Sequence, residues 1–354
     1  MSVVPLVVTT RGLSRESGAV ENVHHGAIAV VAADGRLLYR AGDADYPTFT
    51  RSTLKPFQAL PFVLDGGPAY FGFTTRELAL MCASHSGETM HVDVVAGMLK
   101  KIGCVEADLQ CGCHVPGFYA ALDRKPLPDA VFTPIQNNCS GKHAGFLAAC
   151  RMHGEPLDSY LEIDHDLQHR VHQIVADIAR VAPDTLAVGI DGCSAPNYAM
   201  PLARLAHMYA RLAQGAADAQ YGDGLAALFE AVTQHPDLVS GTARSDLALM
   251  TMGKGTMGAG TMEAGDWVTK IGADGVQAIG VRSAGLGIAL KIADGNRDAL
   301  YCAIAETLLQ LGLVSADLVA SGETPLTRWH NPTLRNARGT ATGEMRAVFT
   351  VQKA

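Results

Sequence analysis

Ser52 and Lys55 are spaced so that a hydroxyl and an amine could work together in nucleophilic catalysis. Residues three apart share one face of a helix, so the two side chains could meet there. A hydroxyl is a weak nucleophile at neutral pH, and an amine takes its proton only while the amine is neutral, a state that burial or nearby cations favour. The spacing predicts a Ser–Lys pair, although a capping serine and a surface lysine explain this segment alone more simply.

Two later segments extend this pattern. Ser84-His85-Ser86 resembles the Ser-x-Asn element of Ser/Lys hydrolases, with Ser86 in place of Asn, although an ordinary loop after a helix is the alternative. Lys270-Ile271-Gly272 resembles their Lys-Thr-Gly strand element, in which the glycine leaves space for a ligand beside the backbone. This order of elements is that of the serine β-lactamase and penicillin-binding fold and its glutaminase relatives. Together the three segments favour a Ser/Lys hydrolase.

Two cysteines and a lysine are candidate metal ligands. Cys139 and Cys193 each stand beside glycine where a loop meets a regular element, and thiolates from two segments supply half of a zinc site. Lys142 follows Cys139 by three residues and would share its helical face, but an amine binds zinc only when deprotonated. Two buried, inert cysteines are the alternative. The Cys111-Gly112-Cys113-His114 segment matches no strong zinc spacing, which favours a structural role.

The elements that must position these residues follow an α+β pattern, with strands at both ends of the chain and helices between them. Residues 1–50 and 266–354 are expected to build one antiparallel sheet, residues 51–265 to be mainly helical, and the whole chain, 1–354, to be a single catalytic unit. The Gly- and Met-rich stretch 251–265 is expected to be a mobile loop. Strands are predicted at 3–9, 26–32, 37–40, 186–190 (buried), 268–271, 275–282, 286–293 and 345–351. Helices are predicted from 51 and at 88–102, 141–153, 164–181, 197–214, 222–235 and 298–313. Asp34-Gly35 predicts a tight hairpin between the strands 26–32 and 37–40, and Thr74 with Glu77 predicts a capping box before 78–82.

Composition narrows the class of protein. The 354 residues are 48% hydrophobic and 18% charged, which allows a sizeable core and disfavours disorder. The net charge of -7 argues against nucleic acid as a partner. No secretory signal and no apolar run of about 18 residues are found, so we expect no membrane association. The eight cysteines are widely spread, which suggests reduced thiols and a cytoplasmic enzyme.

Several of these motifs together resemble one family. The chain is similar to the rhizobial-type, or class 3, L-asparaginases over nearly its whole length. The segments that carry the resemblance are 51–58 (RSTLKPFQ), 82–88 (CASHSGE), 137–143 (NNCSGKH) and 189–196 (GIDGCSAP). Lys270 with the Gly-Ala-Asp-Gly-Val sequence that follows also fits.

The resemblance implies hydrolysis of L-asparagine to L-aspartate and ammonia by a homodimer, with a serine β-lactamase/glutaminase-like fold. Two Ser–Lys tandems of the family match Ser52–Lys55 and Ser84–Lys270. A Zn²⁺ cofactor that need not be essential for catalysis would be held by the residues matching Cys139, Lys142 and Cys193. The substrate-binding residues implied are Arg51, Asp191 and His143.

The mechanism expected is attack by Ser52 on the side-chain amide, with neutral Lys55 as base and Ser84 as a proton relay or an aid to the leaving group. Three neighbouring lysines would repel one another as cations and favour a neutral base. Ser84 is the next candidate nucleophile. Two alternatives stay open: another Ser/Lys amidohydrolase (a glutaminase, or a β-lactam- or peptide-directed enzyme) and a zinc-dependent hydrolase. Asparagine and glutamine differ by one methylene, worth only about 1–3 kcal/mol in a pocket.

Overall fold

The computed structural model of the protein describes residues 2–252 and 265–354, which divide into two compact units. The unit that we call the sheet unit comprises Met1–Thr48, Met200–Ala210 and Met252–Ala354, within the described residues. The unit that we call the helical unit comprises Phe49–Ala199 and Arg211–Thr251. Most of the stretch predicted as a mobile loop, residues 253–264, lies outside the described residues.

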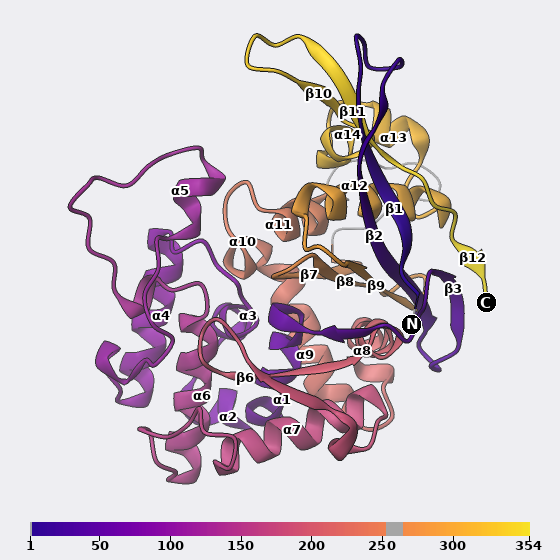
Figure 1. Cartoon of the computed structure of the whole chain (residues 1–354). Helices are drawn as coiled ribbons and strands as arrows, with labels where there is room; N and C mark the ends of the chain where they lie inside the picture. The colour runs from indigo at the N-terminus through magenta and orange to yellow at the C-terminus, as the bar shows by residue number, and fades with distance from the viewer. Residues whose placement is uncertain (1, 253–264) are drawn as a thin grey trace. The chain divides into compact units, whose positions relative to one another are not determined.

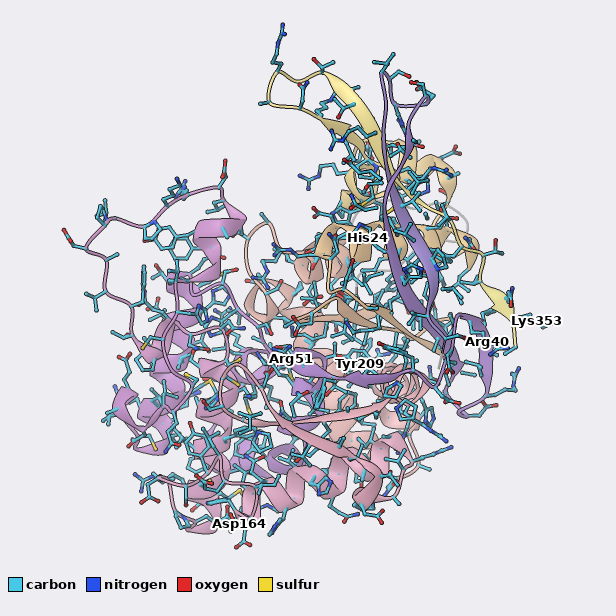
Figure 2. The ribbon with its side chains drawn as sticks, viewed as in Figure 1. His24, Arg40, Arg51, Asp164, Tyr209 and Lys353 are labelled. Carbon is cyan, nitrogen blue, oxygen red and sulfur yellow. The ribbon has the colours of Figure 1, made fainter. Side chains whose placement is uncertain are left out.

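A nine-stranded antiparallel sheet fills the sheet unit, and strands from both ends of the chain build it (Figure 1). Its main order is β10-β11-β1-β2-β9-β8-β7, and β3 pairs with β2 and β12. Figure 2 labels Arg40 and Lys353 where β3 meets β12. The predicted α+β class with a sheet from both termini is therefore confirmed. The strands are β1 (Val4–Arg11), β2 (Ala19–Ala32), β3 (Leu37–Ala41), β7 (Trp267–Gly272), β8 (Val276–Val281), β9 (Leu286–Ile292), β10 (Thr333–Arg335), β11 (Ala341–Ala347) and β12 (Gln352–Lys353).

Local chemistry explains how this sheet turns and packs. The predicted Asp34-Gly35 hairpin joins β2 to β3, and Gly35 has φ 94°, a conformation that favours glycine. Gly287 on β9 allows helix α8 (Leu202–Gln214) to approach, because a Cβ atom there would lie 1.9 Å from the carbonyl oxygen of Ala206. Helix α12 (Arg297–Gln310) contacts β1, β9 and β11. The short helices α13 (Ala316–Ala320) and α14 (Pro325–Trp329) complete this unit.

Helix α6 (Ser140–His153), buried over Ser140–Cys150, lies at the centre of the helical unit. It contacts α1, α3, α4 and α7. The predicted capping box of Thr74 and Glu77 starts α3, and Gly103 ends α4 in the left-handed conformation. The other elements are η1 (Arg51–Leu54), α1 (Lys55–Leu64), α2 (Gly67–Phe71), α3 (Thr75–Met81), α4 (Thr89–Ile102), η2 (Glu106–Asp108), α5 (Gly117–Ala121), η3 (Pro134–Gln136), α7 (Asp166–Ala179), η4 (Pro183–Thr185), η5 (Gly215–Ala217), α9 (Gly222–Gln234), α10 (Pro236–Val239) and α11 (Ser245–Thr251).

Three sequence predictions need correction. The strand expected at 345–351 is β11 (Ala341–Ala347), which begins and ends four residues earlier. The strand expected at 186–190 to be buried is β5 (Ala187–Ile190), and it is largely exposed, with Ile190 84% accessible. The helix expected over 197–214 begins only at Leu202, because β6 (Pro196–Pro201) comes first and pairs with β5. Pro201 disfavours the helical conformation for the residue before it, which keeps the chain extended. Strand β4 (Pro47–Phe49) is the third strand of this small sheet.

No helix among residues 2–252 and 265–354 combines the length and the apolar composition needed to cross a membrane.

Candidate active site

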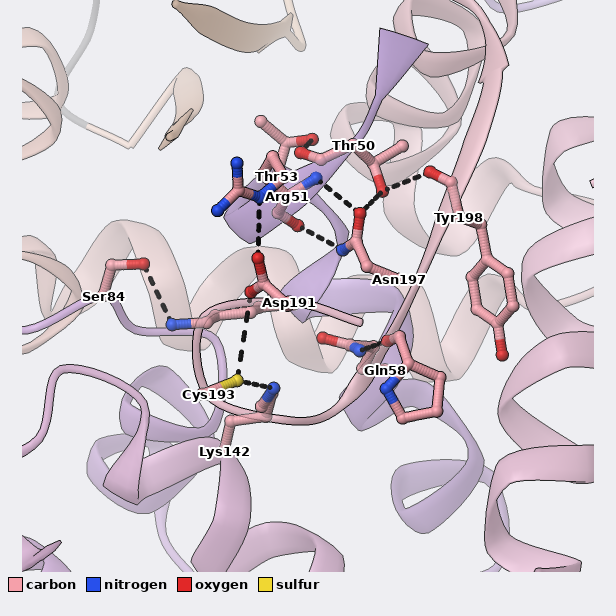
Figure 3. A network of polar contacts seen from close by, with 12 residues as sticks. Thr50, Arg51, Thr53, Gln58, Ser84, Lys142, Asp191, Cys193, Asn197 and Tyr198 are labelled. Atoms are coloured by element: carbon pink, nitrogen blue, oxygen red, sulfur yellow. Dashed lines mark hydrogen bonds and ion pairs between the residues drawn. The ribbon is translucent and has the colours of Figure 1, made fainter. Parts of the chain in front are cut away.

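Ser52 lies in a turn whose backbone is held in an unusual conformation. The residue before it, Arg51, has φ 49°, in the left-handed region that side chains other than glycine rarely adopt. Asn197 bonds this residue twice: its Oδ1 accepts from the Arg51 N–H at 2.9 Å and its Nδ2 donates to the Arg51 carbonyl at 3.0 Å (Figure 3). Thr53 donates from its hydroxyl to the Thr50 carbonyl at 2.6 Å. The half-buried Ser52 is thus fixed at the start of a short 3₁₀ turn.

Lys55 is buried, and its amine reaches a different serine from the one that the spacing pairs with it. Its Nζ donates to Ser84 Oγ at 2.9 Å and also to the backbone carbonyl of Ala83. In the described part of the chain no hydrogen bond joins the Ser52 hydroxyl to this amine. The i, i+3 spacing fixes where the Lys55 side chain begins, but a buried amine must end at hydrogen-bond acceptors, and the segment after α3 supplies them.

Glycines on α6 bring the Ser84 segment to this position. A Cβ atom at Gly141 would lie 2.3 Å from the Leu80 carbonyl oxygen, and one at Gly145 would lie 2.5 Å from Met81. The end of α3 therefore packs directly on α6. Beyond it, His85 approaches the start of the same helix: its Nε2 lies 2.9 Å from Ser140 Oγ. Ser84 and the cysteine that precedes α6 are consequently held by the same pair of helices.

The predicted metal ligands Cys139, Lys142 and Cys193 meet in one buried group, which we call the thiolate cluster. Lys142 Nζ lies 2.9 Å from Cys193 Sγ. A hydrogen bond from the Cys139 thiol, together with the Lys142 charge, lowers the pKa of Cys193 far below its usual value, despite burial. The same hydrogen bond and burial raise the pKa of Cys139. One thiolate therefore lies between a thiol and an ammonium group.

Lys142 does not follow the expectation that neighbouring lysines favour a neutral amine. Burial alone would lower its pKa, but the charges of Cys193, Cys139 and Asp191 and the hydrogen bond to Cys193 together raise the pKa of Lys142. The prediction considered repulsion between lysines and missed the thiolate beside this one. A metal ion could bind here by replacing one proton on Cys139 and one on Lys142. Its ligands would then be two sulfurs and one nitrogen, a donor set that suits zinc. The residues present therefore fit the expected metal.

His143 presents a buried nitrogen that lacks a hydrogen-bond partner among the described residues, its Nε2. Its Nδ1 lies 2.7 Å from the hydroxyl of Tyr160, which accepts from the Gln110 N–H at 2.9 Å. The Tyr160 hydroxyl can therefore donate its proton to Nδ1. Because Nδ1 then acts as the acceptor, the ring proton of His143 lies on Nε2. Burial and the Lys142 charge lower the pKa of His143 to about 4. His143 is therefore neutral, with one donor to offer.

Asp191 links the turn that holds Ser52 to the thiolate cluster. Its Oδ1 accepts from Arg51 Nε at 2.7 Å, and its Oδ2 lies 3.9 Å from Cys193 Sγ (Figure 3). The three substrate-binding candidates, Arg51, His143 and Asp191, thus lie around the same group as the metal-ligand candidates. All nine predicted residues between Arg51 and Cys193 belong to the helical unit.

Lys270, the remaining predicted residue, belongs to the sheet unit. It lies on β7, is buried, and donates from its Nζ to the carbonyl of the next residue, Ile271, at 2.9 Å. The predicted strand position of this lysine is confirmed. Its partnership with Ser84 stays a prediction.

A second group of metal-ligating side chains, which we call the Cys150 cluster, consists of Cys150, Glu155 and His165. Both ring nitrogens of His165 are engaged, Nδ1 by the Leu167 N–H and Nε2 by the Pro156 carbonyl. Arg170 holds both carboxylate oxygens of Glu155, at 2.5 and 2.9 Å. Burial raises the pKa of Cys150 to about 12. These ligand atoms already have protein partners, which favours a structural role for the Cys150 cluster.

Two residues of the site were absent from the sequence prediction, Asn197 and Tyr160. Asn197 directly follows the motif 189–196, and a carboxamide at the end of such a motif is the only sequence signal for it. Tyr160 lies 17 positions after His143 and carries no such signal.

Comparison with known proteins agrees with the family that the motifs resemble. The family model described as L-asparaginase II matches residues 11–347. No curated protein matches the sequence.

Solved structures resemble the chain only weakly. The native form of Mglu has 16% identity and a TM-score of 0.45 over 82% of this chain and 66% of its own, so the chain spans slightly less than two thirds of Mglu. A β-lactamase from Mycobacterium bovis has 14% identity and a TM-score of 0.36 over 82% of this chain and 95% of its own. At these scores the structures say nothing about the reaction of the chain.

Proposed function

We propose, from the membership of this chain in the L-asparaginase II family, that it hydrolyses the side-chain amide of L-asparagine to L-aspartate and ammonia. The observation that carries the proposal is the contact of Lys55 Nζ with Ser84 Oγ at 2.9 Å, one turn after Ser52 and in the same unit. A buried amine that contacts one hydroxyl and follows another by three residues supplies the base that serine amide hydrolysis requires.

Ser52 is the proposed nucleophile. It is the more accessible of the two hydroxyls, since Ser84 is 4% exposed and already bonded to Lys55. Neutral Lys55 takes the Ser52 proton as the oxygen attacks the amide carbon. The C–N bond then breaks, and the proton passes through Lys55 and Ser84 to the leaving nitrogen, which departs as ammonia. Water hydrolyses the β-aspartyl ester and restores the Ser52 hydroxyl. Lys270 supports Ser84 in this scheme.

The charged groups around the turn suit an amino-acid substrate. The Arg51 guanidinium can hold a carboxylate, and Asp191 can hold an α-ammonium group, because each carries the complementary charge. The Nε2 proton of His143 adds a neutral donor. These three contacts would fix the α-carbon end of the substrate and leave its side-chain amide for Ser52.

Cys139, Lys142 and Cys193 would hold a zinc ion, which supplies direct coordination of the α-amino or carboxylate group of the substrate. Zinc needs a deprotonated amine and two thiolates, so Lys142 and Cys139 would each give up a proton when it binds. The chain has a separate nucleophile, so the metal serves binding rather than activation of water.

Ammonia release from L-asparagine and from L-glutamine tests this function in the wild type, Ser52→Ala and Ser84→Ala, each with and without a chelator. We expect the wild type to release ammonia from asparagine and Ser52→Ala to lose at least about a thousandfold in kcat. Activity that survives Ser52→Ala but disappears with the chelator would support a zinc hydrolase instead. Loss only in Ser84→Ala would exchange the roles of the two serines.

Two further arms address the remaining alternatives. A labelled penicillin that forms an adduct with Ser52, with no release of ammonia from either amino acid, would support a β-lactam-directed enzyme. Higher kcat/KM for glutamine would make the chain a glutaminase. The homodimer implied by the resemblance is a proposal that sedimentation velocity can test.

A further inference from the structure

The residue before the proposed nucleophile has a backbone conformation that is uncommon for a residue other than glycine. Arg51 has φ 49°, although it is not a glycine and its side chain is engaged with Asp191. A residue other than glycine persists in this region only where its surroundings enforce the conformation. The neighbouring group that maintains this strained conformation can therefore be identified from its contacts with the Arg51 backbone.

One side chain meets both backbone polar groups of Arg51. The Asn197 carboxamide accepts from its N–H at 2.9 Å and donates to its carbonyl at 3.0 Å, as Figure 3 shows. Asn197 is 3% exposed, so these backbone groups would lack water if the carboxamide were removed. Thr50, the residue before the strained position, donates its own N–H and its hydroxyl to the Tyr198 carbonyl, at 3.0 Å each.

Only a short carboxamide can make this pair of bonds. It carries one acceptor and one donor in a single plane, whereas a carboxylate carries acceptors only and an alanine carries neither. Because Asn197 lies on β6, which pairs with β5 through Gly189↔Asn197, the strand register fixes its backbone. The side chain therefore ties the turn that carries Ser52 to β6, the strand that also pairs with β4 just before the turn.

We propose that Asn197 is a positioning residue for catalysis: its carboxamide holds Arg51 in the left-handed conformation and thereby directs the Ser52 hydroxyl. The dihedral angles of Arg51 set the direction in which the chain enters Ser52, so a change there moves the hydroxyl away from the reacting carbon. The identification of Ser52 as nucleophile belongs to the proposed function, and this inference rests on it. The two hydrogen bonds between the Asn197 carboxamide and the Arg51 backbone do not depend on that identification.

The first experiment compares Asn197→Ala and Asn197→Asp with the wild type. We expect kcat for L-asparagine to fall about 30-fold in Asn197→Ala and about 10-fold in Asn197→Asp, because a small displacement of a nucleophile costs about this much. KM should rise by no more than about threefold, since the Arg51–Asp191 ion pair remains. Asn296→Ala is the matched control: it removes a carboxamide that caps α12, and should lower stability with kcat unchanged.

A double-mutant cycle separates positioning from general damage. Glycine adopts the left-handed conformation readily, so in an Arg51→Gly background the further change Asn197→Ala should lower kcat by less than about threefold. An equal loss in both backgrounds would overturn the proposal, as would near-normal kcat in Asn197→Ala.

Hydrogen exchange supplies a readout that needs no activity. The Arg51 N–H should exchange at least about tenfold faster in Asn197→Ala than in the wild type, while amides of α6 keep their protection. Unchanged protection of the Arg51 N–H would refute the proposed restraint. If the wild type proved inactive on asparagine, the proposed function would fail, and the exchange result would still decide whether Asn197 holds the turn.

Discussion

The thiolate cluster and the Cys150 cluster each combine buried cysteine with other potential ligands, but their candidate ligand atoms have different partners. In the Cys150 cluster the carboxylate is held by Arg170 and both nitrogens of the histidine are engaged. In the thiolate cluster a single thiolate attracts a thiol and an ammonium group, and the neighbouring His143 Nε2 has no partner among the described residues.

The difference shows that a metal site depends on what the candidate ligands already bind. The cation beside the Cys193 thiolate is a lysine, which can lose its proton and become a ligand. The cation beside Glu155 is an arginine, which cannot. A divalent ion would replace protons in the first cluster, but it would have to compete with a fixed positive charge in the second.

Removing a ligand from each cluster should give the largest contrast. Cys193→Ser and Lys142→Ala should each weaken zinc binding by more than about 100-fold, since even residues outside the coordination sphere contribute about 10- to 100-fold. Glu155→Gln should leave zinc affinity unchanged. Competition with a coloured chelator measures all four proteins. Equal losses of zinc affinity from variants of both clusters would contradict the proposed difference between them.

Thiol labelling should sharpen the same contrast in the metal-free protein. A small methanethiosulfonate reagent at pH 7.5 should modify Cys193 at least about 30-fold faster than Cys150, because only Cys193 is held as a thiolate and the pKa of Cys150 is raised to about 12. Peptide mass spectrometry assigns the sites, and added zinc should protect Cys193 but not Cys150. Preferential labelling of Cys150 would contradict the assignment of charge.

Tyr160→Phe tests the hydrogen bonds behind the thiolate cluster. The phenol fixes which ring nitrogen of His143 carries the proton, so its loss should weaken zinc binding about tenfold with the fold intact. Gln168→Ala, which removes the amide bonded to the Tyr160 carbonyl and leaves the phenol in place, is the control. Cobalt substitution reports the affinity through its absorption bands. Identical losses in both variants would assign the effect to packing.

The smallest effect concerns the stability that the Cys150 cluster provides. Burial would raise the pKa of Glu155, but Arg170 outweighs it and the folded-state pKa lies below the usual 4.5. A lowered folded-state pKa stabilises the protein above the unfolded value and loses this effect as pH falls through the folded value. Glu155→Gln should therefore cost about 1 kcal/mol at pH 7 and progressively less below about pH 4.5. Urea unfolding across this pH range measures the trend, and a constant difference would exclude the ion pair as its source.

The sequence predicts the sheet and most of the site because these depend on local patterns. The strands at both ends of the chain, the Asp34-Gly35 turn and the Thr74–Glu77 capping box are confirmed in the structure. The beginning of α8 was missed because the helical spacing after residue 197 continues through Pro201 and hides a strand.

The electrostatics of the site lie beyond local patterns. The charge of Lys142 depends on Cys193, 51 positions later, and the partner of Lys55 lies 29 positions later. Asn197 acts on Arg51 across 146 positions. Each of these contacts follows from tertiary packing, which spacing along the chain does not encode.

The pairing of β1 with β11 has a consequence for the order of folding. Val8 lies opposite Arg346, so β1 waits for a partner that is synthesised more than 300 residues later. Every residue of the helical unit, up to Thr251, leaves the ribosome before that partner does. Pairing at such separation makes folding slow and leaves strand edges open meanwhile. A nascent chain stalled before Ala341 would therefore present β1 with one side unpaired, a template for association that pairing with β11 closes.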